Sequence, residues 1–186
     1  MRVVGGKWRG RALAAPPPDA AIRPTTDRAR ETLFNVLSHD PDVELDGARV
    51  LDLFAGTGAL GFEALSRGAA SCLFVDRGVV ARALIRQTID AFGCGGIARL
   101  HKRDATKLGD AGPMGPYDLV FLDPPYGKNL GEAALASARD GDWIARGARV
   151  VLEEARDAAV AWPDGFTSID DRRVSDTMFY IAEYVG

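Results

Sequence analysis

From residue 48 onward, short apolar runs alternate with stretches of helical periodicity, and this alternation constrains the fold more than any other feature of the sequence. The apolar runs are residues 49–54, 71–75, 98–102, 117–122 and 149–152. The helical stretches are residues 59–67, 79–92 and 130–138. Strands that alternate with helices form a mostly parallel sheet covered on both faces. We therefore expect an α/β fold of the Rossmann-like type.

Both ends of the chain depart from this alternation. Residues 166–173 and 177–184 are strand-like and joined by a turn around residues 175–176, which predicts an antiparallel C-terminal hairpin and a seven-stranded sheet. Residues 2–4 and 11–13 flank a glycine-containing segment, which predicts a small N-terminal β-hairpin. With a proline-rich connector, it makes an extension of residues 1–18 before a main domain of residues 19–186. A helix capped by Thr25 or Thr26, running to about residue 38, opens the main domain.

The net charge of −3 is unevenly distributed along the chain. Residues 1–30 contain seven basic and two acidic side chains, a net of +5, so the remainder has a net of −8. A basic segment of this kind favours contact with nucleic-acid phosphates, although a solvated basic arm without a partner is an alternative.

No apolar run approaches the roughly 20 residues of a membrane span, and the first residues lack the apolar segment of a signal peptide. We therefore expect a cytoplasmic protein without membrane contact. Cys72 and Cys94 have no Cys or His neighbours in metal-ligand spacing. We expect neither a disulfide nor a metal site, and interpret both cysteines as small buried residues.

A glycine-rich turn follows the first predicted strand, in residues 52–61 (Asp-Leu-Phe-Ala-Gly-Thr-Gly-Ala-Leu-Gly). Gly56, Gly58 and Gly61 have the G-x-G-x-x-G spacing that lets a backbone approach a nucleotide-like ligand. Asp76, at the end of the next strand, is placed to bind a ribose diol. A dehydrogenase would show the same pattern, so an NAD-dependent oxidoreductase stays an alternative, as does a plain strand-to-helix turn.

Two further acids favour S-adenosylmethionine as the cofactor. Asp52 precedes the turn and can bind the ammonium of the methionine end, and Asp104 can accept from the adenine amino group while the Ala105 N–H faces a ring nitrogen. A pyrophosphate would be repelled by carboxylates at these places. We also expect Phe54, in the glycine-rich turn, and Arg77, beside Asp76, to contact the cofactor. The alternative for Asp104 is a helix cap.

The fourth strand is followed by Asp123, Pro124, Pro125 and Tyr126, at the sheet edge where open α/β folds bind ligands. The Asp123 carboxylate and the Pro124 carbonyl can accept the two N–H bonds of an exocyclic base amine, which directs its lone pair at a methyl group. Both prolines stiffen the loop, and Tyr126 offers a ring on which a flipped base can stack. The tetrapeptide therefore predicts methylation of a nucleobase amine; the alternative is a rigid turn.

With these residues, the chain resembles the bacterial 16S ribosomal RNA guanine-N2 methyltransferase family of the RsmD type. The similarity lies in residues 2–11 (Arg-Val-Val-Gly-Gly-Lys-Trp-Arg-Gly-Arg), 23–28 (Arg-Pro-Thr-Thr-Asp-Arg), 30–35 (Arg-Glu-Thr-Leu-Phe-Asn), 52–61 and 123–126. The segment of residues 23–35 is the most specific, because the glycine turn and the Asp-Pro-Pro-Tyr motif also occur in DNA adenine-N6 methyltransferases. That class is the nearest alternative, although the chain has no insertion large enough for a target-recognition domain.

The resemblance implies a class I S-adenosylmethionine-dependent methyltransferase that modifies a guanine of 16S rRNA, on an assembled or partly assembled 30S particle. It implies that the methionine end of the cofactor is covered by Arg23, Pro24, Thr25 and Arg28. It also implies that rRNA is bound by the N-terminal hairpin through Arg2, Lys7, Trp8, Arg9 and Arg11. For Arg28 an exposed helix face is the alternative, and for Trp8 packing is nearly as good an explanation as stacking on RNA.

Overall fold

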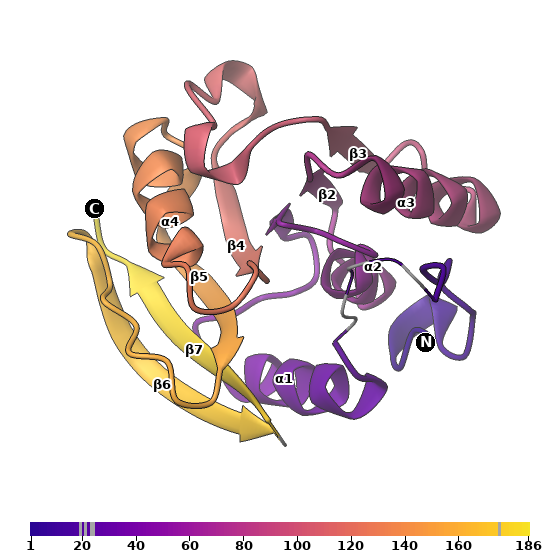
Figure 1. The fold of residues 1–186 in the computed structure, drawn as a ribbon, viewed down its shortest axis with the longest axis horizontal. Coiled ribbons are helices and arrows are strands. Elements are labelled where there is room, and N and C mark those ends of the chain that lie inside the picture. Colours follow the sequence, from indigo (N-terminus) through magenta and orange to yellow (C-terminus); the bar gives the residue numbers. More distant parts are fainter. Residues whose placement is uncertain (19, 21, 23–24, 175) are drawn as a thin grey trace.

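The computed structural model describes residues 1–18, 20, 22, 25–174 and 176–186, and its centre is a seven-stranded sheet of order β3-β2-β1-β4-β5-β7-β6 (Figure 1). The parallel strands are β1 (Arg49–Leu53), β2 (Ser71–Val75), β3 (Ala98–His101), β4 (Tyr117–Leu122) and β5 (Ile144–Ala155). The antiparallel hairpin is β6 (Phe166–Val174) and β7 (Thr177–Tyr184), with β7 paired to β5. The predicted fold class is confirmed.

Four α-helices connect and cover the strands. They are α1 (Asp27–His39), α2 (Ala59–Ser66), α3 (Val79–Phe92) and α4 (Leu130–Asp140). Three short 3-10 turns, η1 (Gly6–Trp8), η2 (Ala105–Lys107) and η3 (Gly112–Met114), lie in the connections. The Thr26 hydroxyl accepts from the Ala29 N–H at 3.2 Å, so Thr26 is the cap of α1 among the two candidates.

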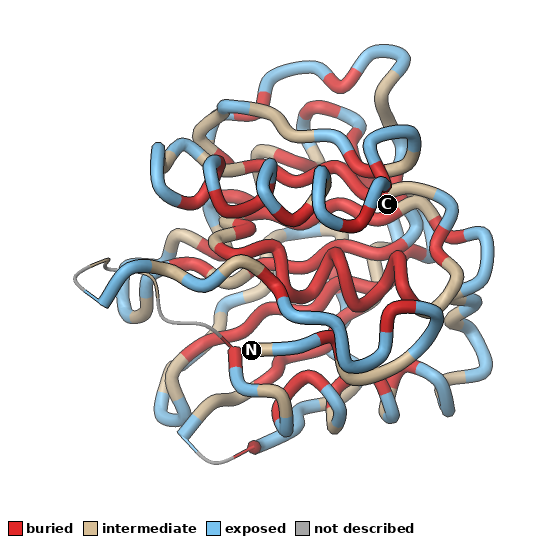
Figure 2. The backbone as a smooth tube through the Cα atoms, turned by 90° about the vertical axis from the view of Figure 1, so that its right-hand side faces the viewer, coloured by how far each residue is buried: buried red, intermediate tan, exposed pale blue. Residues whose placement is uncertain are grey.

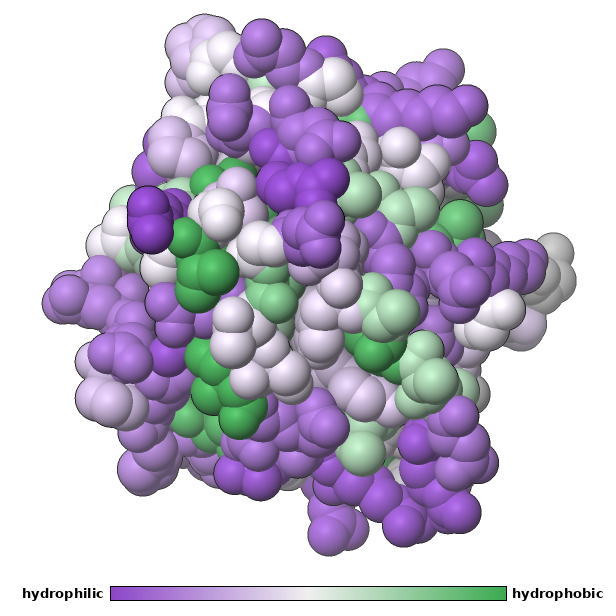
Figure 3. Space-filling model, turned by 90° about the vertical axis from the view of Figure 1, so that its left-hand side faces the viewer, coloured by the Kyte–Doolittle hydropathy of each residue, from purple (hydrophilic) through white to green (hydrophobic). Residues whose placement is uncertain are grey.

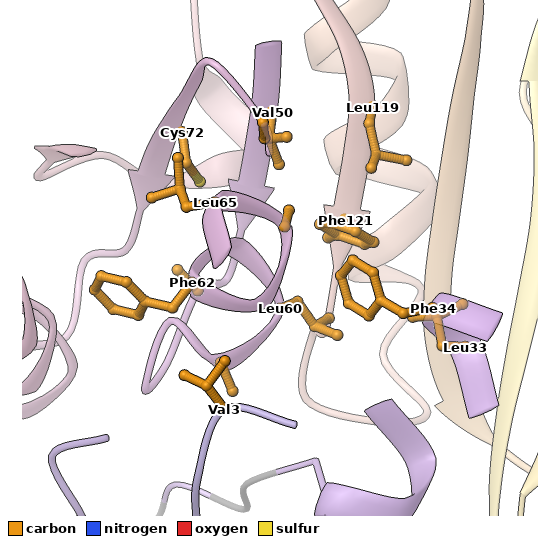
Figure 4. Packing of buried hydrophobic residues seen from close by; sticks show 14 of the residues in the cluster. Val3, Leu33, Phe34, Val50, Leu60, Phe62, Leu65, Cys72, Leu119 and Phe121 are labelled. Carbon is orange, nitrogen blue, oxygen red and sulfur yellow. The ribbon is translucent and has the colours of Figure 1, made fainter. Parts of the chain in front are cut away.

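The sheet separates two hydrophobic cores because successive side chains of a strand point to opposite faces. One core joins α1, α2 and α3 to residues such as Val50, Leu119 and Phe121, and Figure 4 shows the ring of Phe34 turned toward Phe121. The other core places α4 and η2 against Leu51 and Leu122. Figure 2 shows the buried backbone gathered in the middle layer and the exposed backbone on the outer sides of the helices.

The predicted N-terminal β-hairpin forms only in part. A single bridge pairs Arg2 with Ala12, and η1 occupies the tip where two regular strands were expected. The reason is packing against α2: Glu63 accepts from the Val4 and Gly5 N–H groups at 2.9 and 2.8 Å. In a longer ladder the Gly5 N–H would face the partner segment, so Glu63 occupies a donor that such a ladder would need.

The outer strand β6 lies at the edge of the sheet, and most of its residues between Phe166 and Val174 are exposed. Figure 3 shows this side of the molecule as mainly hydrophilic, with small separate hydrophobic areas. Within the described part of the chain, no helix has the length and apolar character that crossing a membrane requires.

Candidate active site

A cavity of about 530 Å³ lies at the carboxyl ends of the parallel strands. The chain leaves β1 for β2 on one side and reaches β4 on the other, so the strand order reverses here, which is where open α/β sheets bind ligands. The cavity is lined by the glycine turn after β1, the ends of β2 and β3, the first turn of α3 and the loop after β4.

The glycine turn brings the backbone to the cavity wall through left-handed conformations. Gly56 and Gly58 have φ of 55° and 74°, and both positions favour glycine. Phe54, which also lines the cavity, has a φ of 56°, an uncommon conformation for a bulky residue and one that gathers at functional sites. Gly61 has a different role: a Cβ there would lie 2.4 Å from Phe74 and 2.6 Å from Cys72, so it permits close packing of α2 on β2.

The two acids of the first strand ends are held by backbone donors. Asp52 is buried and accepts from the Gly61 N–H at 3.0 Å. Burial raises the pKa of Asp52 well above its ordinary value, and the nearby charge of Asp76 raises it further. Asp76 accepts from the Gly56 N–H at 2.9 Å and from the Gly78 N–H at 2.7 Å, one with each oxygen. Each oxygen keeps a lone pair, so the Asp76 carboxylate is preorganised to accept from a diol.

Asp104 lines the cavity and also caps η2. The capping role that the sequence offered as an alternative is therefore present, and it leaves Asp104 at the cavity where adenine binding was expected. Its Oδ1 accepts from the N–H and the hydroxyl of Thr106 at 3.0 and 2.7 Å, and these bonds lower the pKa of Asp104. Its Oδ2 lies 3.1 Å from the Arg77 guanidinium. Ala105 lines the cavity beside it. Asp104 is thus ionised and fixed at the end of β3.

All four residues of the predicted catalytic loop line the cavity. The Asp123 N–H donates to the Leu53 carbonyl at 3.3 Å, which ties the start of the loop to the end of β1. Pro124 is buried, Pro125 is exposed and Tyr126 is half-buried. The Tyr126 hydroxyl donates to Glu153 Oε1 at 3.1 Å. Burial, followed by the negative charge of Glu153, raises the pKa of Tyr126, so the phenol stays protonated.

Glu153, on β5, is a residue that sequence reasoning missed. It is 3% exposed, and its other oxygen accepts from the Thr25 hydroxyl at 2.8 Å. The predicted strand ended at residue 152, because an acid after an apolar run resembles a strand end. An acid in line with an apolar strand, followed by the second acid Glu154, is the signal that could have found it.

The segment expected to cover the methionine end is found in part. Thr25 lines the cavity. Arg28 is exposed on α1 and is not among the residues that line the cavity, which agrees with its alternative as an exposed helix residue. Arg23 and Pro24 lie outside the described residues.

The basic residues expected to contact RNA are mostly exposed, whereas Trp8 is not. Arg2, Lys7, Arg9 and Arg11 are exposed side chains around the N-terminal turn. Trp8 is 8% exposed, and its ring packs at 4.9 Å from that of Phe92 on α3. The structure therefore favours the packing alternative for Trp8, since a buried ring has no free face for a base. Among the described residues, no group of three or more His, Cys, Asp or Glu side chains could hold a metal ion.

A Rossmann-like sheet of this order, with an acid at the end of each of the first three strands and an antiparallel terminal hairpin, defines a class I S-adenosylmethionine-dependent methyltransferase. Residues 1–183 match the family described as "Conserved hypothetical protein 95". The chain belongs to this family, and the resemblance noted in the sequence is confirmed.

Three similar proteins illustrate the relationship. Ribosomal RNA small subunit methyltransferase D of Escherichia coli strain K12 is 42% identical over 157 residues, which are 82% of this chain and 74% of the relative. The putative rRNA methyltransferase YlbH of Bacillus subtilis is 35% identical over 159 residues, 84% of each chain. The solved structure of the putative methyltransferase yhhF from Escherichia coli superimposes with a TM-score of 0.82 at 30% identity, over 100% of this chain and 98% of that one.

Proposed function

We propose that this protein transfers a methyl group from S-adenosylmethionine to the exocyclic N2 amine of a guanine in 16S rRNA. The observation that carries the proposal is the convergence of Asp52, Asp76, Asp104 and the loop of residues 123–126 on one cavity. Relatives named as small-subunit rRNA methyltransferases support rRNA as the substrate class.

The residues of the cavity fit the cofactor. Asp76 is held by two backbone N–H groups with lone pairs left for a ribose diol, and buried Asp52 offers a carboxylate to an ammonium. Asp104 and Ala105 line the cavity, and in the proposal the Asp104 carboxylate and the Ala105 N–H bind the edge of the adenine. When bound, S-adenosylmethionine supplies an electrophilic sulfonium methyl.

The loop after β4 supplies the acceptors for the target amine. An exocyclic amine is a weak nucleophile because its lone pair is delocalised into the ring. The Asp123 carboxylate and the Pro124 carbonyl accept its N–H bonds and orient the lone pair for in-line attack. Transfer would form the N–C bond as the methyl C–S bond breaks, leave S-adenosylhomocysteine, and release one amine proton to solvent. The ring of Tyr126 supports the flipped base by stacking.

We further propose that residues 1–18 contact rRNA through exposed Arg2, Lys7, Arg9 and Arg11, within an assembled or partly assembled 30S particle. Exposed guanidinium and ammonium groups neutralise phosphates without reading sequence. A DNA adenine-N6 methyltransferase would use the same loop, and DNA phosphates would suit the basic segment equally, so the relatives named for small-subunit rRNA, and not the charge, favour RNA. An NAD-dependent oxidoreductase would leave Asp123–Tyr126 without a role.

The test uses small subunits from cells that lack the gene. The purified protein is incubated with them and with isotopically labelled S-adenosylmethionine, and the rRNA nucleosides are separated by mass spectrometry. The proposal predicts label in N2-methylguanosine. Label in N6-methyladenosine of added DNA, with none in rRNA, would establish the DNA alternative instead.

A further inference from the structure

One buried carboxylate joins two cavity-lining residues that lie far apart in the sequence. Glu153 Oε1 accepts from Tyr126, in the loop after β4, and Glu153 Oε2 accepts from Thr25, immediately before α1. The Tyr126 hydroxyl also lies 3.4 Å from the Thr177 hydroxyl at the start of β7. The end of β5 therefore holds together segments that lie far apart in the sequence and meet beside the sheet (Figure 1).

Burying a carboxylate raises the free energy of the folded protein unless the carboxylate is hydrogen-bonded. The groups that donate to a buried carboxylate therefore indicate its structural role. Glu154, the next residue, is also buried, and its Oε1 accepts from the backbone N–H groups of Gly127 and Ala155. Glu153 instead accepts from two side-chain hydroxyls, and both of their residues line the cavity although Glu153 itself does not.

The two hydroxyls belong to two cavity-lining residues from different segments, which we call the cofactor wall (Thr25) and the base-stacking wall (Tyr126). Tyr126 lies on the side of the target base, and its ring direction is set by where its hydroxyl is held. Thr25 lies in the segment assigned to the methionine end of the cofactor. Because one carboxylate fixes both, displacement of either wall loosens the hydrogen bond that orients the other.

We propose that Glu153 is a positioning residue that couples the cofactor wall to the base-stacking wall, by holding Thr25 with one oxygen and Tyr126 with the other. The inference rests on the proposed function, because it assigns Tyr126 to base stacking. Glu153 acts on the reaction through these two hydroxyls and contacts neither the cofactor nor the base.

Three conservative variants separate the two effects. Thr25→Val removes the hydroxyl on the cofactor side, and we expect it to weaken S-adenosylhomocysteine binding on the order of tenfold and, because the shared carboxylate is loosened, to lower the rate of methyl transfer at saturation about threefold. Tyr126→Phe keeps the ring but removes its anchor, and we expect the reverse weighting: a rate on the order of tenfold lower, with cofactor affinity about threefold weaker. Glu153→Gln removes the negative charge and one of the two acceptor oxygens, so it is expected to weaken both bonds and to show both defects at once.

Calorimetric titration with S-adenosylhomocysteine and single-turnover methyl transfer to small subunits give the two readouts. Tyr180→Phe is the matched control, because the Tyr180 hydroxyl donates to the Ala158 carbonyl at 2.7 Å, and Tyr180 does not line the cavity. Its affinity and rate should stay within about twofold of wild type, as expected for a site away from the reacting groups. A Glu153→Gln/Tyr126→Phe double variant should be no slower than the slower single variant, because both changes remove the same interaction.

Wild-type affinity and rate in a folded Glu153→Gln variant would overturn the coupling. If that variant does not fold, Tyr126→Phe decides, because wild-type transfer without the hydroxyl would overturn the proposal. Additive losses in the double variant would overturn it as well. The proposed function fails separately, if the unaltered protein does not methylate small subunits.

Discussion

The third glycine of the turn predicts a measurable packing defect. Gly61 lies within α2, and a Cβ there would meet two buried side chains of β2, Phe74 at 2.4 Å and Cys72 at 2.6 Å. Carbon contacts are normally about 3.5–4.0 Å, so a Gly61→Ala variant must move α2 away from β2. Overpacking costs about 1–3 kcal/mol, and two contacts this short place Gly61→Ala in the upper part of that range, at about 2–3 kcal/mol. Alanine has a higher helix propensity than glycine, and this offsets about 1 kcal/mol of the loss in the free energy of unfolding.

The net loss expected for Gly61→Ala is therefore about 1–2 kcal/mol of the free energy of unfolding. At this chain length it corresponds to a fall in melting temperature of about 2–8 °C. Urea denaturation followed by circular dichroism measures the free energy, and thermal melting measures the temperature. Gly96→Ala is the control, because nothing lies within 4 Å of a Cβ there and its φ is not positive. A Gly61→Ala variant as stable as wild type would refute the packing role.

Two further predictions concern the acids. We expect Asp76→Asn to weaken S-adenosylhomocysteine binding by about 10- to 100-fold, as measured by calorimetry. The reason is that the carboxylate held by Gly56 and Gly78 is replaced, so its charge-assisted bonds to a ribose are lost. Unchanged affinity would contradict the role assigned to Asp76. Hydrogen bonds from Arg149 lower the pKa of Asp40 from its ordinary 3.8. Its stabilisation is present above that value and lost as pH falls through the lowered pKa, so in urea titrations Asp40→Asn should lose less stability on acidification than wild type.

The sequence was sufficient for the parts of the fold that follow from periodicity. Four of the five parallel strands were predicted within about two residues, because apolar runs bounded by turn residues have few other structures available. β5 was predicted too short: it extends from Ile144 to Ala155 across charged positions. Arg149 and Glu153 look like surface residues in a sequence, and only tertiary partners such as Asp40 make their burial possible.

The N-terminal segment shows the same limit. Val3, Trp8 and Leu13 belong to the core cluster that includes α2, so their partners come from more than 40 residues away along the chain. A local pattern of alternating residues with glycines predicts a hairpin, but the hydrogen bonds that Glu63 accepts from this segment favour a turn instead. Local propensity was overridden by tertiary contacts.

The sequence predicted those site residues that can be located from the pattern of strands alone. Asp52 is near the end of strand β1, Asp76, Asp104 and the loop of residues 123–126 come after the ends of β2, β3 and β4, and parallel strands bring those ends to one edge. The roles expected of Arg28 and Trp8 depend on the direction in which each side chain points, and residue spacing alone does not specify that direction. The Glu153 bridge between Thr25 and Tyr126 required knowledge of which strand lies next to the loop.

The central claim is that Asp123 orients the target amine beside the bound cofactor. Single-turnover methyl transfer to small subunits by Asp123→Ala, measured together with calorimetric binding of S-adenosylhomocysteine, tests it most directly. We expect cofactor affinity to stay within about threefold of wild type while the transfer rate falls by at least about 100-fold, because a transition-state contact is removed. A folded Asp123→Ala variant that binds the cofactor and transfers methyl at the wild-type rate would contradict it.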